Sequence, residues 1–345
     1  MKIGIVNDVS LAREALRRVV QAMPGHRVAW LAKDGAEAID LTEKDRPDLI
    51  LMDLIMPGLD GAEATRRIMA DNPCPILVVT ATVSGHMNKV YEAMGHGALD
   101  AVDTPCLGPL GQVSGATDLI EKITTVGKLI GLTAGMDTLH VPSRPAPTGR
   151  ERLGTIVLLG ASTGGPKALA DILAGFPAEL EAAVVIVQHV DAAFAPGLAG
   201  WLGDHTGRRV EVITPGRRPE PGTILMAATD DHLVMTPGRW LDYDPDPKHH
   251  HYRPSVDVFF SSIAAHWPDP GVAAILTGMG RDGAAGLLEL RKAGWHTIAQ
   301  DRASCVVWGM PKAAAELGAA AQILPVDQIA GAIAKRVRME ASARE

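Results

Sequence analysis

The stretch TIVLLGASTGGPKALADIL, residues 155–173, decides how this chain folds. It begins with an apolar run (155–160), continues through the glycine-rich turn ASTGG (161–165), and ends in a segment whose apolar residues have helical spacing. Pro166 lies in the first turn of that segment, where a missing N–H costs little. The stretch therefore predicts a buried strand, a sharp turn and a helix, the unit from which parallel α/β sheets are built.

The same alternation of apolar runs and helical periods extends in both directions from this stretch. Before it, we expect strands at residues 3–6, 26–32, 48–53, 75–82 and 98–102. After it, apolar runs return at 182–190 and 271–280, and a helical period follows at 284–293. This pattern predicts an α/β fold with two doubly wound parallel-sheet domains.

A stretch with neither period separates the two halves of the chain. Residues 132–152 are rich in Pro, Gly, Thr and Arg, a composition that favours a flexible linker. We therefore expect a first domain over 1–131, the linker over 132–152, and a second domain over 153–340.

The overall composition excludes several classes of protein. With 345 residues and 47% hydrophobic side chains, the chain is long enough for two cores, which excludes a mainly disordered protein. A net charge of −7 without a dense Lys/Arg stripe argues against a nucleic-acid partner and a transcription factor. Three scattered cysteines, no secretory signal and no apolar run of about 18 residues predict a cytoplasmic protein without membrane insertion. A monomer is the expected state.

The turn after the strand at 155–160 carries a candidate nucleophile. Gly160 to Gly164 match G-x-S-x-G, a turn that lifts the hydroxyl of Ser162 above the sheet and directs the Thr163 N–H toward a developing oxyanion. Two alternatives remain open on these residues alone. The turn could cradle a phosphate at the helix N-terminus, or it could be a tight turn whose serine has no chemical role.

A base and an acid are expected at neighbouring strand ends. His189 ends the apolar run AAVVIVQH, and Asp282 follows the apolar run and glycine-rich loop at 271–283. Because parallel strands end at the same edge of a sheet, we expect both side chains near Ser162. Alone, His189 would more simply cap its strand.

The N-terminal half carries two carboxylates at its own strand ends. Asp8 and Asp53 follow apolar strands, and such a pair is stable when a hard cation such as Mg²⁺ shares it. Thr80 offers a hydroxyl at a third strand end, and the Pro57 turn leaves the backbone carbonyl of Ile55 able to face the ion. On residue type alone, turn residues or helix caps are the alternative.

The N-terminal pattern resembles the receiver domain of bacterial response regulators, over roughly the first 125 residues. The resemblance rests on NDVSLARE, MDLIMPGLDG, TATVSGHM and GALDAVDTP. It implies a flavodoxin-like fold in which Asp53 is the phosphoacceptor, Asp8 a Mg²⁺ ligand and Thr80 the phosphorylation switch, with a histidine kinase as phosphodonor.

Three positions depart from the receiver pattern. Asn7 stands where one of two acidic residues is usual, Ala101 replaces an aromatic residue, and Thr104 replaces a lysine. Because that lysine would contact the phosphoryl group as a point charge, we expect a domain that accepts phosphate but responds weakly.

The second half resembles the catalytic domain of the CheB family from about 153 to 335, through GASTGGP, VIVQHV, YRPSVDVFF and LTGMGRDGAAG. The resemblance implies a Rossmann-like serine hydrolase with the triad Ser162, His189 and Asp282, in which the Met279 N–H helps Thr163 hold the oxyanion. It also implies protein-glutamate methylesterase and protein-glutamine glutaminase activity on methyl-accepting chemoreceptors, with no cofactor for the ester hydrolysis. The alternatives are a non-catalytic binding module and a general carboxylesterase.

Overall fold

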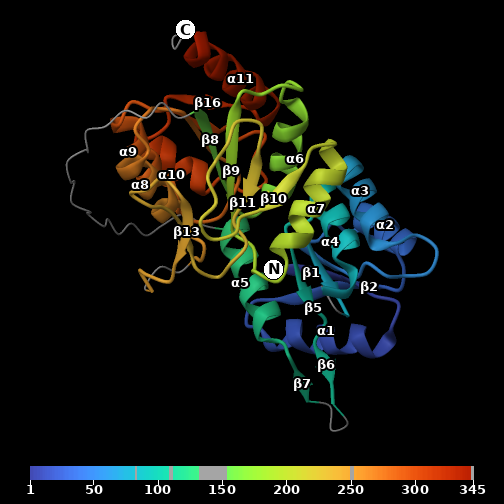
Figure 1. Cartoon of the computed structure of the whole chain (residues 1–345). Helices are drawn as coiled ribbons and strands as arrows, with labels where there is room; N and C mark the ends of the chain where they lie inside the picture. The colour runs from blue at the N-terminus through green and yellow to red at the C-terminus, as the bar shows by residue number, and fades with distance from the viewer. Residues whose placement is uncertain (82–83, 109–111, 132–153, 249–251, 343–345) are drawn as a thin grey trace. The chain divides into compact units, whose positions relative to one another are not determined.

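The computed structural model describes residues 1–345 apart from 82–83, 109–111, 132–153, 249–251 and 343–345. The chain divides between residues 137 and 138 into two compact units, and each has its own parallel sheet (Figure 1). The expected α/β fold with two doubly wound sheets is thus confirmed. The linker expected over 132–152 lies outside the described residues.

The N-terminal unit is a five-stranded sheet in the order β2-β1-β3-β4-β5. Its strands are β1 (Lys2–Val6), β2 (Arg27–Ala32), β3 (Leu49–Met52), β4 (Ile76–Thr80) and β5 (Asp100–Asp103). All neighbours pair in parallel. This is the strand order of flavodoxin-like folds, in which the ends of β1 and β3 meet where the order reverses.

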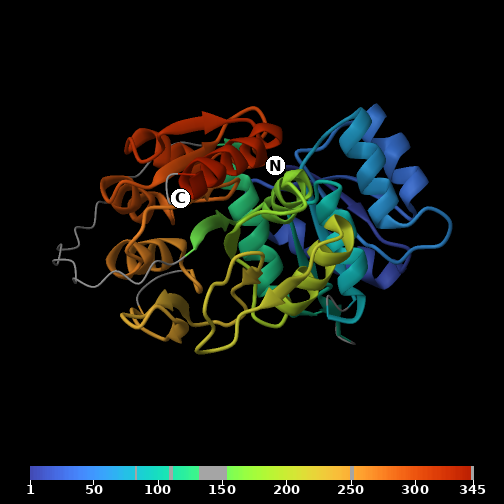
Figure 2. The same cartoon turned by 45° about the horizontal axis from the view of Figure 1, so that its top comes forward.

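Alternate residues of these strands pack against helices on opposite faces of the sheet. The helices are α1 (Ser10–Ala22), α2 (Gly35–Lys44), α3 (Gly61–Asp71), α4 (Met87–Gly95), which follows the 3-10 turn η1 (Ser84–His86), and α5 (Thr117–Gly131). Ile5 and Leu51 share a core cluster with Leu16 of α1 and Ile123 of α5. Helices α2 and α3 pack side by side, as do α3 and α4 (Figure 2). A short antiparallel pair, β6 (Cys106–Leu107) and β7 (Val113–Ser114), was not expected from the sequence.

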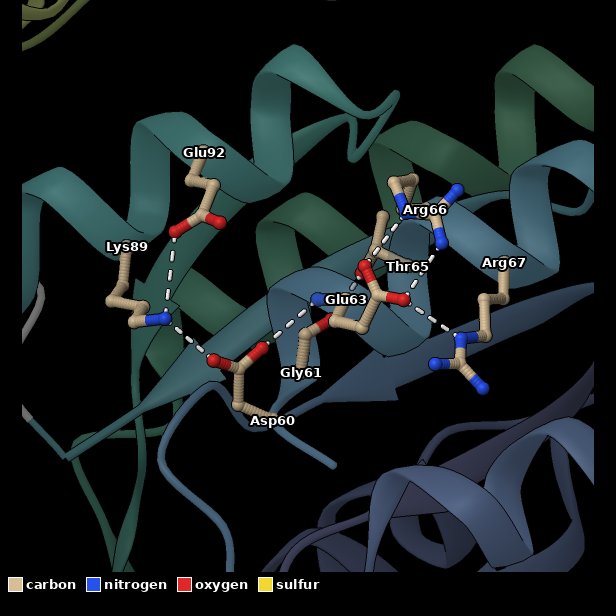
Figure 3. A network of polar contacts seen from close by, with 8 residues as sticks. All are labelled: Asp60, Gly61, Glu63, Thr65, Arg66, Arg67, Lys89 and Glu92. Carbon is tan, nitrogen blue, oxygen red and sulfur yellow. Dashed lines mark hydrogen bonds and ion pairs between the residues drawn. The ribbon is translucent and has the colours of Figure 1, made fainter. Parts of the chain in front are cut away.

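A polar network ties α4 to the start of α3 (Figure 3). The Asp60 carboxylate accepts the Glu63 backbone N–H at 2.9 Å and so caps α3, while Lys89 of α4 donates to its second oxygen at 2.5 Å. Glu63 in turn pairs with Arg66 and Arg67 at 2.6 and 2.8 Å. Because these side chains are at least partly exposed, water screens their charges and each ion pair adds little to stability.

The C-terminal unit is a seven-stranded parallel sheet in the order β10-β11-β9-β8-β14-β15-β16. Its strands are β8 (Thr155–Ala161), β9 (Ala182–Gln188), β10 (Val210–Val212), β11 (Ile224–Met226), β14 (Val272–Ile275), β15 (His296–Gln300) and β16 (Gln322–Leu324). Strands β9, β10 and β11 lie on one side of β8, and the later strands β14, β15 and β16 lie on the other side, so the strand order reverses at β8. Ligands bind at such a reversal in open α/β sheets, outside the carboxyl ends of the strands.

Helices cover both faces of this second sheet (Figure 1). They are α6 (Gly165–Gly175), α7 (Ala195–Thr206), α8 (Val256–His266), α9 (Ala284–Lys292), α10 (Met310–Glu316) and α11 (Val326–Ser342). Helix α6 packs on α7 and α11, and α8 packs on α9. Phe259 and Phe260 of α8 are fully buried with Leu158 and Val185 of the sheet. An antiparallel hairpin, β12 (His232–Met235) and β13 (Leu241–Asp244), packs beside α8.

In the described part of the chain, no helix has both the length and the apolar character needed to cross a membrane.

Candidate active site

The turn between β8 and α6 presents Ser162 at the carboxyl edge of the second sheet. The Ser162 backbone N–H donates to Thr277 O at 3.1 Å, and its carbonyl accepts the Gly165 N–H at 2.7 Å. Gly164 has φ of +77°, a left-handed conformation that favours glycine. The sharp turn expected from the sequence is therefore present, with Ser162 8% exposed.

Gln188 holds the serine turn and the histidine together. It is the last residue of β9, and its Nε2 donates to Ser162 O at 2.8 Å and to His189 O at 3.1 Å. The side chain fits because residue 165 is glycine: a Cβ there would lie 1.9 Å from Gln188 Oε1. The strand ends that carry Ser162 and His189 are thus fixed to each other.

His189 and Asp282 form a hydrogen-bonded pair at this edge. His189 Nε2 lies 2.8 Å from Asp282 Oδ2, and the two side chains are 8% and 6% exposed. Because a carboxylate accepts, the proton of the neutral ring lies on Nε2 and the lone pair on Nδ1. Within the described part of the chain, Nδ1 is buried and has no partner.

The Asp282 carboxylate lies at the N-terminus of α8. Besides His189, it accepts the Val256 N–H at 2.7 Å, the Ser255 hydroxyl at 2.7 Å and the Asp257 N–H at 3.2 Å. Burial raises the pKa of Asp282, but the hydrogen bonds from His189, Ser255 and Val256 outweigh it, so the pKa lies below its ordinary value. The aspartate therefore stays ionised, as an acid that orients a catalytic histidine must.

Asp257 makes the reciprocal contact. It lies in the first turn of α8 and accepts the Gly286 N–H in the first turn of α9 at 2.7 Å. Burial, together with the charge of Asp282, raises the pKa of Asp257 to about 7. Asp282 thus caps α8 and Asp257 caps α9. The repulsion between the two charges is seen in the raised pKa of Asp257.

Two backbone amides near Ser162 are free to bind an anion. Among the described residues, no acceptor takes the N–H of Thr163 or of Met279. The loop with Met279 adjoins the serine, since a Cβ on Gly278 would lie 2.8 Å from Ser162 Cβ. The structure thus brings all five sequence-predicted residues of the second unit to one edge, although no hydrogen bond joins the Ser162 hydroxyl to His189. Such bonds are often absent before substrate binds.

Sequence reasoning missed the residues that hold this site together. Ser255, Asp257 and Gln188 received no role, although Ser255 begins S-V-D-V ahead of an apolar run, a helix-cap signal that could have marked the start of α8. Ser255 does cap α8, accepting from Val258 N at 3.3 Å. Its bond to Asp282 spans 27 residues of sequence, and no local pattern predicts such a contact.

Asp53 lies at the corresponding edge of the first sheet. It is 7% exposed and accepts the Leu54 N–H at 2.7 Å and the Asn7 Nδ2 amide at 2.9 Å. Burial raises the pKa of Asp53, and the charge of Asp8 raises it further. The charge of Asp8 thus acts on Asp53 at this edge of the sheet and disfavours its ionised form.

Thr80, also predicted for this site, and Thr104, which departs from the receiver pattern, lie on the same edge of the sheet. Thr80 ends β4, and Thr104 follows β5, with its N–H bonded to Thr80 O at 2.8 Å. Both hydroxyl oxygens are buried, and that of Thr104 has no hydrogen-bond partner among the residues described. The Thr80 hydroxyl faces Asp53 and lowers the pKa of its carboxyl, against the larger effect of burial. Within the described residues, no three His, Cys, Asp or Glu side chains come together as a metal site. The oxygen ligands expected here are the carboxylates of Asp8 and Asp53 and a backbone carbonyl such as that of Ile55. This set fits Mg²⁺, which takes oxygen ligands and usually keeps several waters.

Taken alone, each unit defines a class. A serine turn beside an Asp-bound histidine, at the reversal point of a parallel sheet, is the arrangement of serine hydrolases. The first unit has the flavodoxin-like strand order with a buried aspartate at the end of β3.

Comparisons with known proteins agree with this division. The family model of the CheB methylesterase matches residues 157–333, and that of the response regulator receiver domain matches residues 3–107. The protein-glutamate methylesterase/protein-glutamine glutaminase 1 of Burkholderia lata is 52% identical over 340 residues, covering 98% of this chain and 100% of that protein. One from Mesorhizobium japonicum is 51% identical, covering 96% and 98%. The crystal structure of the Thermotoga maritima CheB methylesterase catalytic domain matches 53% of this chain and 98% of that chain, with 34% identity and a TM-score of 0.50.

The chain belongs to the CheB methylesterase family and carries the N-terminal receiver domain.

Proposed function

We propose that the C-terminal unit hydrolyses γ-methyl esters of glutamate side chains on methyl-accepting chemoreceptors, releasing methanol. The observation that carries the proposal is the 2.8 Å bond from His189 Nε2 to Asp282, which leaves the lone pair of Nδ1 without a partner among the described residues. The names of the relatives support the substrate class.

The first step is acylation. Ser162 Oγ attacks the ester carbonyl, and His189 Nδ1 takes the serine proton. Asp282 stabilises the imidazolium through Nε2, while the N–H groups of Thr163 and Met279 donate to the tetrahedral oxyanion. Each such donor contributes about 3 kcal/mol. The proton on Nδ1 then passes to the methoxide as methanol leaves.

The second step is hydrolysis of the acyl-enzyme. Water attacks the glutamyl ester of Ser162, His189 Nδ1 takes the water proton, and the glutamate carboxylate leaves as the serine is reprotonated. The same groups deamidate glutamine, with ammonia as the first product. That reaction is harder because the leaving nitrogen must be protonated by His189.

The N-terminal unit regulates this activity. A chemosensory histidine kinase phosphorylates Asp53, with Asp8, Asp53 and the Ile55 carbonyl as the residues that would hold Mg²⁺. The ion would neutralise charge on the phosphoryl group when bound. The hydroxyl of Thr80 acts as the switch by donating to a phosphoryl oxygen. Because Thr104 stands where receiver domains usually have a lysine, the domain responds only weakly to its phosphorylation. We place the protein in the cytoplasm as a monomer.

The test uses the full chain and a methylated chemoreceptor. Methanol release and the loss of methyl groups from receptor glutamates are followed for the wild type, His189→Gln and His205→Gln. His205 is an exposed histidine of α7 and serves as the matched control. We expect release by the wild type and His205→Gln and almost none by His189→Gln. Equal release by all three proteins would refute the assignment of the base.

A further inference from the structure

Tyr252 takes no part in the proposed acyl transfer, yet it lies flat on the histidine. The centroids of the Tyr252 and His189 rings are 4.4 Å apart, and their planes differ by 3°. We propose that Tyr252 is a positioning residue, which holds the His189 ring by its face and stabilises the ring when it carries the serine proton. This inference rests on the proposed function of the site.

The stacking supplies a constraint that the hydrogen bond to Asp282 does not. The bond from Nε2 fixes one point of the ring, and the ring can still turn about that bond. Among the described residues, Nδ1 has no partner that would stop this rotation. A parallel aromatic ring at 4.4 Å does stop it, because turning the imidazole would drive its edge into the face of Tyr252.

The same contact favours the charged intermediate. A cation over an aromatic face within about 6 Å of its centroid is attracted by the ring quadrupole, most strongly away from water. The His189 side chain is 8% exposed, so water screens this attraction little. The titratable groups that face the ring are Asp282 and Tyr252, with Asp257 directly behind Asp282. Asp282 acts in the ring plane and Tyr252 on the ring face, so their effects are separable.

The fold holds Tyr252 in place from two sides. It precedes the Ser255–Asp257 segment that binds Asp282, and the Ser255 N–H donates to the buried Nδ1 of His232 at 3.1 Å. On the other side, a Cβ on Gly280 would lie 3.3 Å from the Tyr252 hydroxyl. One short segment therefore supports both members of the histidine–aspartate pair.

The experiment compares Tyr252→Phe and Tyr252→Leu in the full chain. Phenylalanine keeps the aromatic face and leucine removes it. Tyr243→Leu is the matched control, because Tyr243 of β13 is also half-buried, but its hydroxyl donates to Ile213 O, directly after β10. The probe is a peptide with a glutamate γ-methyl ester, assayed for kcat and KM. The protonation of the His189 ring is followed by NMR, through the chemical shifts of its ring C–H protons as the pH changes.

Tyr252→Leu is expected to lower kcat about 3- to 30-fold with little change in KM. It should also move the ring titration of His189 to lower pH. Tyr252→Phe should retain both properties, and Tyr243→Leu should lose stability without moving the ring titration. The proposal is overturned if Tyr252→Leu matches the wild type, or if Tyr252→Phe loses as much as Tyr252→Leu. If the wild type hydrolyses no ester, the proposed function fails, while the ring titration still tests the role of Tyr252.

Discussion

Replacing Asp282 by asparagine tests how one carboxylate serves both stability and catalysis. The aspartate accepts four hydrogen bonds, and Oδ2 receives two of them, from His189 Nε2 and the Val256 N–H. Oδ1 receives the other two, from the Ser255 hydroxyl, which can also accept, and from the Asp257 N–H. The asparagine oxygen is therefore better placed at the Oδ2 position. Its NH₂ group then faces the Asp257 N–H, which loses its acceptor.

The expected loss of stability follows from these contacts. A buried hydrogen bond to a charged group contributes about 1.5 to 3 kcal/mol, and an anion at a helix N-terminus contributes about 0.3 to 2 kcal/mol. Against this, Asp257 no longer faces a second charge, and that charge is one cause of its raised pKa. We expect a net loss of about 2 to 4 kcal/mol in the free energy of unfolding.

The expected loss of activity, expressed as a free energy, is larger than the expected loss of stability. Without the carboxylate, no negative charge faces Nε2, so the imidazolium formed during acylation is less stabilised. The comparable change in a serine protease triad lowers kcat roughly 10⁴-fold. Urea unfolding and methanol release measure the two effects on the same preparations. A folded Asp282→Asn protein that keeps a tenth of the wild-type kcat would refute this reasoning.

Three further predictions follow from single residues. Burial and the charge of Asp282 raise the pKa of Asp257 to about 7, so its contribution to stability is present below its unfolded-state pKa and is lost as the pH rises through about 7. Asp257→Asn should remove this loss, as measured by urea unfolding at pH 4 and pH 8. Gly165→Ala places a Cβ against Gln188 and should cost about 1 to 3 kcal/mol and lower kcat, whereas Gly331→Ala, with open space around it, should not destabilise the chain. A small phosphodonor should add one phosphate to the wild type and none to Asp53→Ala by mass spectrometry, and no adduct in either protein would contradict the assignment.

The sequence predicted the parts of the fold that have long apolar runs. Strands β8 and β9 span seven residues each and are buried throughout, so their patterns are unambiguous. Strands β10 and β11 have three residues each, too few to show a period, and no expectation covered them. Helix α8 was also not predicted, because its apolar residues are not confined to one face of VDVFFSSIAAH.

The candidate site could be predicted to the same extent and for a similar reason. Ser162, His189 and Asp282 each follow an apolar run, and the geometry of parallel strands brings such residues to one edge. Two details of the site could not be predicted: the ring nitrogen of His189 that binds Asp282, and the position of Tyr252 against that ring. Both depend on contacts between segments far apart in the chain.

The measurement that tests the central claim most directly is methanol release from methylated chemoreceptor by the full-length chain and by Ser162→Ala at matched concentration. Circular dichroism on both proteins confirms that they are folded. Serine catalysis predicts release by the wild type and a drop of roughly 10⁴-fold or more in the variant. Equal rates in the two proteins, or no release by either, would contradict serine catalysis and favour a binding role for this site.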